Sequence, residues 1–194
     1  MKILIAVPTY ETITPNTFKS IWDLEPGGHE LNFEFVKGYD CAKARNDIGQ
    51  KTLDDGYDAV LMIDSDMIIP KDAIINMTDK PFDVVLGCYP KANTKERLVN
   101  LFKLGKPNYV DRYTYDTLPK ERFIVKGGGF GCALVHAKVF KNVAFPWFKY
   151  VVYDNGGNLS EDLYFCHQAR KAGFVIDAEP KVRCGHQTRY FQYE

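Results

Sequence analysis

The stretch from Tyr57 to Pro70 constrains the fold of this chain more than any other part of its sequence. An apolar run from Ala59 to Ile63 ends abruptly in Asp64-Ser65-Asp66 and then resumes for three residues before the proline. A continuous apolar run of this kind is typical of a strand that is buried on both faces of a sheet. Because buried carboxylates are costly without a partner, the stretch predicts a strand that delivers two carboxylates to a cation.

Strand patterns alternate with helix patterns on the amino-terminal side of this stretch. Lys2 to Val7 is a continuous apolar run, and Leu31 to Val36 alternates apolar with polar residues, as expected of a strand with one more exposed face. Helical patterns follow each of them, at Thr12 to Leu24 and at Cys41 to Asp54. This alternation predicts a parallel, doubly wound α/β sheet, in which ligands bind beyond the carboxyl ends of the strands.

The first two predicted helices have clear boundary signals. Thr12 or Thr14 can cap the first helix, and its apolar stripe consists of Phe18, Ile21, Trp22 and Leu24. Asp40 is a suitable cap for the second helix. Further strands are predicted at 82–86, 123–125, 132–135 and 174–176, short helices at 70–77 and 137–140, a helix capped by Ser160 that ends near Lys171, and a variable loop with one or two short strands at 91–120.

Length and composition favour one ordinary globular domain. The chain has 194 residues, of which 45% are apolar, and its 25 basic and 25 acidic residues give a formal charge of zero, so no global field favours nucleic acid. No apolar run is long enough to span a bilayer, and the run after Lys2 is too short for a signal peptide. Five widely spaced cysteines suit reduced core thiols, so we expect a cytoplasmic protein.

Two groups of residues are candidates for a metal site. Asp64 and Asp66 can share a divalent cation, although surface loops supply many such triplets without function. His186 follows Cys184 and Gly185 near the carboxyl terminus, where an imidazole is more often structural than a ligand. Added to carboxylate and phosphate oxygens, this imidazole would complete a site that suits Mn²⁺ better than Ca²⁺.

Three further motifs have both a functional and a structural explanation. In Ser160-Glu161-Asp162, one carboxylate can act as a general base, but helix capping explains the same residues. The glycines from Gly127 to Gly131 can admit a sugar close to the backbone, or simply form a turn. Arg45 is either a solvated charge on a helix or a residue that points toward a diphosphate.

Six short motifs occur in an order that resembles a known family. They are Ile3 to Tyr10, Ala44-Arg45-Asn46, Leu61 to Asp66, Gly128 to Gly131, Ser160 to Asp162, and Cys184 to His186. Together they resemble the nucleotide-sugar-dependent glycosyltransferases of the GT-A fold, closest to the family 2-like group. The resemblance covers nearly the whole chain and implies a Rossmann-like, mostly parallel sheet flanked by helices, with a small antiparallel element in the second half.

The resemblance also implies a division of labour along the chain. Residues 1–194 would form one catalytic domain, with a nucleotide-binding half at about 1–90 and an acceptor-binding and catalytic half at about 91–194. A sugar would pass from a nucleoside diphosphate sugar, with UDP the expected nucleotide, to a hydroxyl of a glycan or another acceptor. The implied cofactor is Mn²⁺ or Mg²⁺.

Individual roles follow from the same resemblance. Nucleotide-sugar contacts are implied for Pro8, Thr9, Glu11, Asp40, Arg45, Asp64, Ser65, Gly128 and Gly129. Asp66 and His186 would bind the metal, with Asp64 near it, directly or through water. Asp162 would be the catalytic base of an inverting reaction, with Glu161 beside it; if Asp162 is only a cap or an acceptor ligand, a retaining reaction stays open.

The sequence leaves two alternative functions open. A nucleotidyltransferase of nucleotide-sugar synthesis also uses metal-binding aspartates on an alternating sheet, but it typically has a glycine-rich loop where this chain has Pro8 to Glu11. The second alternative is a non-catalytic module that binds nucleotide or carbohydrate. The chain also has Lys37-Gly38-Tyr39-Asp40 where the family has an acidic turn, so the residue that recognises the base is not fixed.

Overall fold

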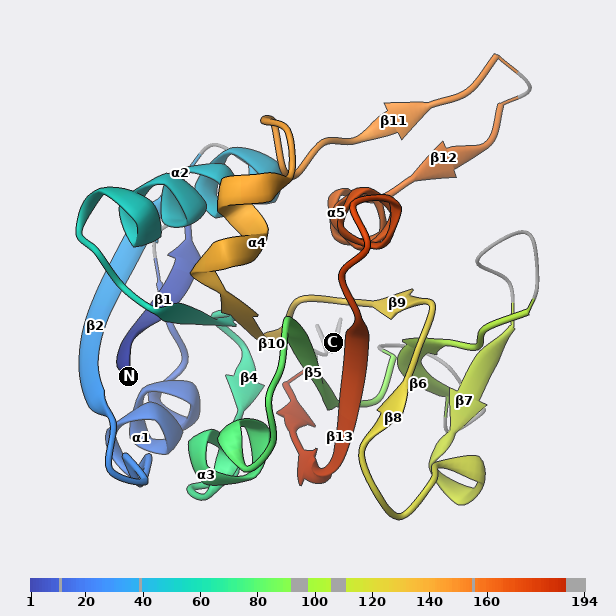
Figure 1. Cartoon of the computed structure of the whole chain (residues 1–194). Coiled ribbons are helices and arrows are strands. Elements are labelled where there is room, and N and C mark those ends of the chain that lie inside the picture. The colour runs from blue at the N-terminus through green and yellow to red at the C-terminus, as the bar shows by residue number, and fades with distance from the viewer. Residues whose placement is uncertain (11, 39, 92–97, 106–110, 155, 188–194) are drawn as a thin grey trace, which may run out of the picture.

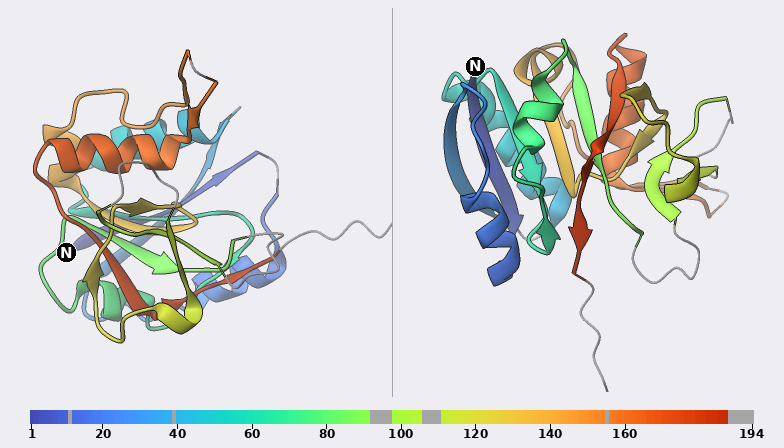
Figure 2. Two further views of the ribbon diagram at one scale, coloured as in Figure 1. Left: turned by 90° about the vertical axis from the view of Figure 1, so that its right-hand side faces the viewer. Right: turned by 90° about the horizontal axis from the view of Figure 1, so that it is seen from below.

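The protein is a three-layer α/β structure with a central sheet between two layers of helices (Figure 1). This computed structural model describes residues 1–10, 12–38, 40–91, 98–105, 111–154 and 156–187. Its helices are α1 (Pro15–Trp22), α2 (Cys41–Asp54), α3 (Ala73–Thr78), α4 (Ala137–Asn142) and α5 (Glu161–Lys171), with one 3₁₀ turn, η1 (Tyr115–Thr117). The α2, α4 and α5 helices cover one face of the sheet, and α1 and α3 cover the other (Figures 1 and 2).

Seven strands of the described chain form the central sheet, in the order β2-β1-β3-β10-β5-β13-β8. They are β1 (Lys2–Thr9), β2 (Glu30–Lys37), β3 (Ala59–Ile63), β5 (Val84–Cys88), β8 (Phe123–Ile124), β10 (Cys132–His136) and β13 (Ile176–Arg183). Five of them run in one direction, whereas β10 and β8 are antiparallel to their neighbours. The prediction of a mostly parallel sheet is confirmed. The direction of β10 was not predictable, because an interior antiparallel strand has the same apolar pattern as a parallel one.

In the described part of the chain, three smaller sheets lie beside this central sheet. Antiparallel strands β6 (Leu98–Phe102), β7 (Arg112–Thr114) and β9 (Gly127–Gly128) form the small element that was expected in the second half. The short strands β4 (Met67–Ile68) and β14 (Gly185–His186) pair beyond the end of β3. A hairpin of β11 (Val151–Val152) and β12 (Asn158–Leu159) projects from the body immediately before α5 (Figure 1).

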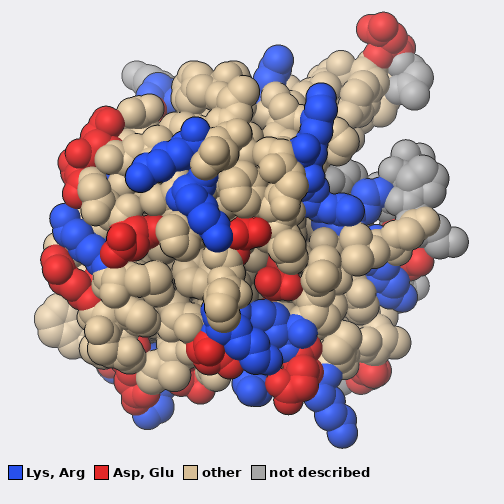
Figure 3. Space-filling view, in the orientation of Figure 1, with Lys and Arg blue, Asp and Glu red and all other residues tan. Residues whose placement is uncertain are grey.

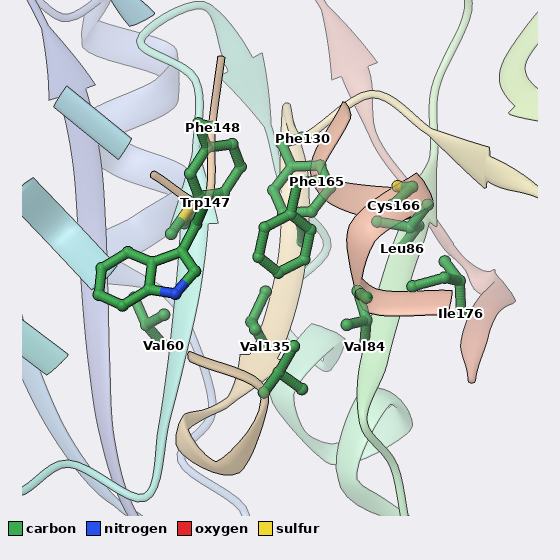
Figure 4. Packing of buried hydrophobic residues seen from close by; sticks show 14 of the residues in the cluster. Val60, Val84, Leu86, Phe130, Val135, Trp147, Phe148, Phe165, Cys166 and Ile176 are labelled. Atoms are coloured by element: carbon green, nitrogen blue, oxygen red, sulfur yellow. The ribbon is translucent and has the colours of Figure 1, made fainter. Parts of the chain in front are cut away.

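The described residues form two apolar core clusters, one on each face of the sheet. On the face that α2, α4 and α5 cover, Val60 of β3 and Val135 of β10 pack with Trp147, Phe148 and Phe165 (Figure 4). The alternate residues of the same strands, including Leu61 and Leu134, belong to the cluster on the other face. Burial on both faces explains why β1 and β3 are unbroken apolar runs, as the sequence indicated.

The predicted apolar stripe of α1 is partly wrong. Trp22 is 78% exposed and Phe18 is 45% exposed, and their rings stack on the outer side of the helix. The helix instead buries Thr17 and Ser20, and the Ser20 hydroxyl accepts a hydrogen bond from the backbone N–H of Ile69 at 3.1 Å. These small side chains let the helix lie close to the chain after β4, which a search for large apolar residues does not reveal.

The strand expected at 174–176 runs instead from Ile176 to Arg183. Glu179 and Pro180 interrupt the apolar pattern of this segment, so the pattern does not predict the second half of the strand. Glu179 is nevertheless buried, and it accepts a hydrogen bond from Nε of Arg122 at 3.1 Å. The positive charge that pairs with Glu179 therefore comes from a distant part of the chain, so the strand pattern did not show it.

The charged surface has no single dominant sign on the face shown in Figure 3, where basic and acidic side chains are interspersed. Four of the cysteines are buried and Cys41 is exposed, and all five are free thiols. No helix in the described residues combines the length and the apolar character that crossing a membrane requires.

Candidate functional site

The site lies where β3 ends. After Ile63 the chain turns through Asp64-Ser65-Asp66 before β4 begins. The N–H of Asp64 donates to the carbonyl of Gly131 at 3.1 Å, and the carbonyl of Asp64 accepts from Met67 at 3.1 Å. These backbone bonds fix the turn at the carboxyl end of a buried strand, which is where the sequence predicted the two carboxylates.

A buried arginine joins three carboxylates at this edge of the sheet. Arg45 lies in α2 and is only 2% exposed. Its Nη2 donates to Oδ1 of Asp64 at 2.8 Å, and its Nη1 donates to Oε1 of Glu161 at 2.6 Å and to Oδ1 of Asp162. The alternative of a solvated helix charge is therefore wrong for Arg45. The guanidinium brings together acidic groups from two elements that are far apart in sequence.

Asp162 is the carboxylate with the most unusual environment. Its side chain is 17% exposed, and its Oδ2 accepts a hydrogen bond from the N–H of Phe130 at 3.3 Å. Burial, together with the negative charges of Glu161 and Asp64, raises the pKa of Asp162 to about 7, although Arg45 opposes this shift. A carboxylate whose pKa lies close to neutral pH is suited to accept and release a proton.

Glu161 and Asp162 both lie in the first turn of α5, but a capping hydrogen bond from Ser160 does not explain their positions. Ser160 occupies the N-cap position, and its side chain makes no capping hydrogen bond. The predicted cap position of Ser160 and the predicted place of Glu161 and Asp162 in the first turn are therefore confirmed, whereas a capping hydrogen bond from the Ser160 side chain is not formed. Both point to Arg45, so a tertiary contact rather than a local cap explains their positions.

Tyr150 connects the projecting hairpin region to the same acids. The Tyr150 hydroxyl hydrogen-bonds Glu161, and burial, followed by the charge of Glu161, raises the pKa of Tyr150 well above its usual value. Tyr150 as a whole is half exposed. An exposed aromatic residue thus stands next to the acidic pair.

Asp66 and His186 form the second part of the site. Nε2 of His186 lies 3.4 Å from Oδ2 of Asp66, and Nδ1 lies 3.2 Å from the carbonyl oxygen of Pro90. The hydrogen bond with Asp66 raises the pKa of His186. Their pairing follows from the β4–β14 ladder, in which His186 is opposite Met67.

This pair fits a divalent cation only in part. A carboxylate and an imidazole in contact are a suitable donor set for Mn²⁺ or Mg²⁺ when oxygen ligands from elsewhere complete the shell. Among the described residues, no group of three or more acidic, histidine or cysteine side chains is placed to hold a metal. Phosphate or water oxygens would have to supply the remaining ligands.

A cavity of about 270 Å³ opens between the end of β1 and the start of α2. Its walls are Pro8, Thr9, Tyr10, Gly38, Asp40, Cys41, Ala44 and Ser65. Four residues that the sequence nominated for nucleotide binding thus line one space. Asp40 also caps α2, as predicted, because its Oδ1 accepts from the N–H of Lys43 at 2.7 Å. Glu11, also nominated, lies outside the described residues.

The glycine-rich segment is packed against neighbouring residues and does not present its backbone to solvent at Gly128 and Gly129. Gly128 and Gly129 are buried, and a Cβ at Gly129 would lie 1.7 Å from Nδ2 of Asn100 and 2.2 Å from the Tyr89 hydroxyl. At Gly128 a Cβ would lie 2.6 Å from the carbonyl oxygen of Asn100. The close approach that these glycines permit is to Asn100 of β6 and to Tyr89, whereas the sequence predicts a close approach of a sugar.

Several residues of the site were missed by sequence reasoning. The hydroxyl of buried Tyr89 accepts from the N–H of Gly131 at 3.1 Å and from Nδ2 of Asn100 at 2.7 Å. The Thr14 hydroxyl donates to Oε1 of Gln187, the residue after His186. Asn46 holds the backbone of Trp147 and Phe148. Isolated polar residues of this kind carry no local signal; only the Ala44-Arg45-Asn46 motif pointed to one of them.

Comparison with known proteins identifies the fold. No protein-family model matches the sequence, and no curated protein matches it. Among solved structures, A197 from STIV has a TM-score of 0.67 at 16% identity, over 97% of this chain and 87% of that one. GalNAc-T7, solved with UDP, GalNAc and Mn²⁺, has a TM-score of 0.64 at 10% identity, over 97% of this chain and 43% of that one.

A third solved structure, residues 1–349 of S. aureus TarS, has a TM-score of 0.52 at 16% identity, over 96% of this chain and 60% of that one. This chain therefore spans less than two thirds of GalNAc-T7 and of that TarS structure. At such low identities the likeness shows the fold alone. It agrees with the strand order and helix layers described above, and we conclude that this chain has the GT-A fold of the glycosyltransferases that its motifs resemble.

Proposed function

We propose that this chain is a glycosyltransferase that moves a sugar from a nucleoside diphosphate sugar, in the first instance a UDP-sugar, to a hydroxyl group of a glycan or another acceptor. One observation carries the proposal. Asp64, which precedes the cavity-lining residue Ser65, and Asp162, whose pKa is raised to about 7, meet at Arg45. A donor-side acid and a proton acceptor thus lie side by side on a GT-A fold.

The donor would bind across the carboxyl edge of the sheet. Pro8, Thr9, Asp40 and Ser65 line the cavity that would take the nucleoside. The diphosphate would extend from there toward Asp64 and Asp66. UDP is proposed as the nucleotide because the motifs resemble a family that uses it and because GalNAc-T7 was solved with UDP.

A divalent cation, Mn²⁺ or Mg²⁺, would be held by Asp66 and His186, with Asp64 close to it. When bound, such a cation supplies positive charge that stabilises the diphosphate as it leaves. Asp64 would use its Oδ2 to interact with the cation, directly or through water, because its Oδ1 accepts a hydrogen bond from Arg45.

Asp162 would act as the general base. The acceptor oxygen attacks the anomeric carbon, the bond from that carbon to the diphosphate oxygen breaks, and the hydroxyl proton passes to the Asp162 carboxylate. Attack from the face opposite the leaving group inverts the configuration. Glu161 is proposed to assist from beside Asp162, where Tyr150 also lies.

A panel of donors tests this proposal. The protein is incubated with UDP- and GDP-sugars, with and without MnCl₂, and nucleoside diphosphate release and the shift in melting temperature are both measured. We expect a metal-dependent shift and slow release with at least one UDP-sugar. The Asp162→Asn variant should show the same increase in melting temperature as the wild type, but it should not release nucleoside diphosphate.

The alternatives predict different results in the same panel. A nucleotidyltransferase would release pyrophosphate from a nucleoside triphosphate and a sugar phosphate. A non-catalytic binding module would release no nucleoside diphosphate. Its ligand-dependent increase in melting temperature would be the same in Asp66→Asn and in Asp162→Asn as in the wild type. If no donor gives either a shift or release, the glycosyltransferase proposal is wrong.

A further inference from the structure

Arg45 links the two halves of the proposed reaction centre. Its Nη2 contacts Asp64, which follows β3 on the donor side, at 2.8 Å. Its Nη1 contacts the acids in the first turn of α5, Glu161 at 2.6 Å and Asp162. One planar guanidinium thus fixes the spacing between a donor-side carboxylate and the proposed base.

Stability does not explain this arrangement. One positive charge faces three carboxylates, and the guanidinium is almost completely buried. Its Nε is a buried donor without a hydrogen-bond partner in the described part of the chain. Buried ion pairs are often no more stable than an apolar replacement, and an unpaired buried donor is a further cost. Arg45 therefore fits a role in organising the site better than a role in stabilising the fold.

Contact with the nucleotide does not explain it either. The cavity is lined by the neighbouring Cys41 and Ala44 of α2, whereas Arg45 is absent from its walls. Both terminal nitrogens of Arg45 are already directed at carboxylates. The side chain points into the protein, toward Phe130, whose ring centre lies 5.9 Å from the guanidinium carbon.

We propose that Arg45 is a positioning residue for the transfer reaction, which holds Asp162 in the orientation needed to receive the acceptor proton and at a fixed spacing from Asp64. This inference rests on the proposed function and replaces the nucleotide contact that the sequence resemblance implied. The N–H of Phe130 holds Oδ2 of Asp162, and Arg45 holds Oδ1, so both oxygens are oriented by donors.

The charges around Asp162 set the expected pH response. Glu161 lies beside it in α5, Asp64 faces it from the end of β3, and Arg45 faces it from α2. The thiols of Cys41 and Cys166 and the hydroxyl of Tyr89 also lie within electrostatic range of Asp162. Arg45 is the cation in this set, so its removal leaves like charges that make Asp162 hold its proton more tightly.

Two substitutions of Arg45 distinguish the effect of its hydrogen-bond geometry from the effect of its positive charge. Arg45→Lys keeps the positive charge but cannot span both sides of the site, and Arg45→Gln removes the charge as well. Lys43→Gln is the matched control, because Lys43 lies in the same helix and forms an exposed pair with Asp47. For each variant we would measure the Kd of UDP with MnCl₂ by calorimetry, and kcat and KM for transfer from pH 5 to pH 9.

We expect Arg45→Lys to lower kcat by about tenfold or more, with the Kd of UDP changed by less than about threefold. For Arg45→Gln we expect a loss of kcat on the order of 100-fold at pH 7, and a shift of the acidic limb of the pH profile to higher pH. Lys43→Gln should match the wild type. If Arg45→Gln does not fold, Arg45→Lys decides the question alone.

Three results would overturn the inference. A loss of UDP affinity in proportion to the loss of activity would make Arg45 a donor ligand. Wild-type kcat in Arg45→Lys would show that charge alone matters, and wild-type kcat in both variants would leave Arg45 without a role in the reaction. A wild-type protein that neither binds nor turns over any donor would instead refute the proposed function.

Discussion

The imidazole of His186 lies 3.4 Å from the carboxylate of Asp66, and its other nitrogen faces the carbonyl of Pro90 at 3.2 Å. When Nδ1 carries the proton and donates to Pro90, the lone pair of Nε2 points toward Asp66. The side chain is thereby oriented for a ligand shared with the carboxylate. The strand pair β4–β14, rather than any spacing in the sequence, makes this contact.

Removal of either member of this pair should abolish metal-dependent stabilisation. We expect MnCl₂ with UDP to raise the melting temperature of the wild type, since a ligand at 100 times its Kd stabilises a fold by about 2.7 kcal/mol. In Asp66→Asn and in His186→Gln this increase should be absent. Asp72→Asn, at an exposed acid outside the site, is the control. An unchanged increase in either site variant would place the metal elsewhere.

Asp162→Asn should make the protein more stable at alkaline pH while it removes activity. The pKa of Asp162 is about 7 in the folded protein and 3.8 ordinarily, so the folded state binds the proton more tightly than the unfolded state does. Stability from this group is fully present below pH 4 and is lost as the pH rises through 7. Asparagine cannot ionise, so the variant avoids that loss, which is on the order of 4 kcal/mol above pH 7.

Urea unfolding at pH 5 and pH 8 measures this effect. The gain in stability of Asp162→Asn over the wild type should be larger at pH 8 than at pH 5. A gain that is equal at the two pH values would contradict the environment described for Asp162. Asp72→Asn again serves as the control, because its exposed carboxylate should give no such difference.

Asn46→Ala should loosen the aromatic segment that supports α5. The Asn46 Oδ1 accepts from the N–H groups of Trp147 at 3.0 Å and Phe148 at 3.1 Å, and its Nδ2 donates to the Phe148 carbonyl at 2.8 Å. Leaving these buried groups unpaired should cost about 1–3 kcal/mol. Phe148 stacks on Phe165 of α5, the helix whose first turn carries Asp162. A looser contact with α5 should therefore also lower activity.

Tryptophan fluorescence can follow this change. The chain has two tryptophans, and Trp22 is exposed whereas Trp147 is buried, so the experiment is performed in a Trp22→Phe background. Emission from Trp147 should shift to longer wavelength in Asn46→Ala. The exposed Asn142, substituted with alanine, should leave both the emission and the stability within about 0.5 kcal/mol of the parent. If both variants behave alike, Asn46 has no special role.

Gly129→Ala should destabilise the fold by about 1–3 kcal/mol, because the added methyl group collides with Asn100 and Tyr89. Removal of the Asn100 side chain relieves the closer of the two collisions. The double variant Gly129→Ala/Asn100→Ala should therefore be more stable than the sum of the two single effects predicts, as measured by chemical denaturation. Strict additivity would show that the glycine is not required for this contact.

Local sequence patterns were sufficient to predict those features that depend only on residues within one helix or strand. The apolar run of β3 and its end at Asp64 could be predicted because a doubly covered strand admits few polar residues. The Asp40 cap of α2 follows from a side chain that reaches an N–H three residues away. In contrast, the stripe assigned to α1 was wrong at Trp22, because the surface that the helix meets is not encoded in the helix itself.

By itself, the sequence determined the alternation of strands and helices, the position of Asp64 and Asp66 at the end of β3, and the presence of two acids at the start of α5. Only the tertiary structure decided how these parts are used. Arg45 stands among polar residues of α2, and nothing near it in sequence shows that it is buried against Glu161, 116 residues away. A guanidinium acquires its partners only when α2, β3 and α5 pack together, so its role depends on contacts that no local pattern contains.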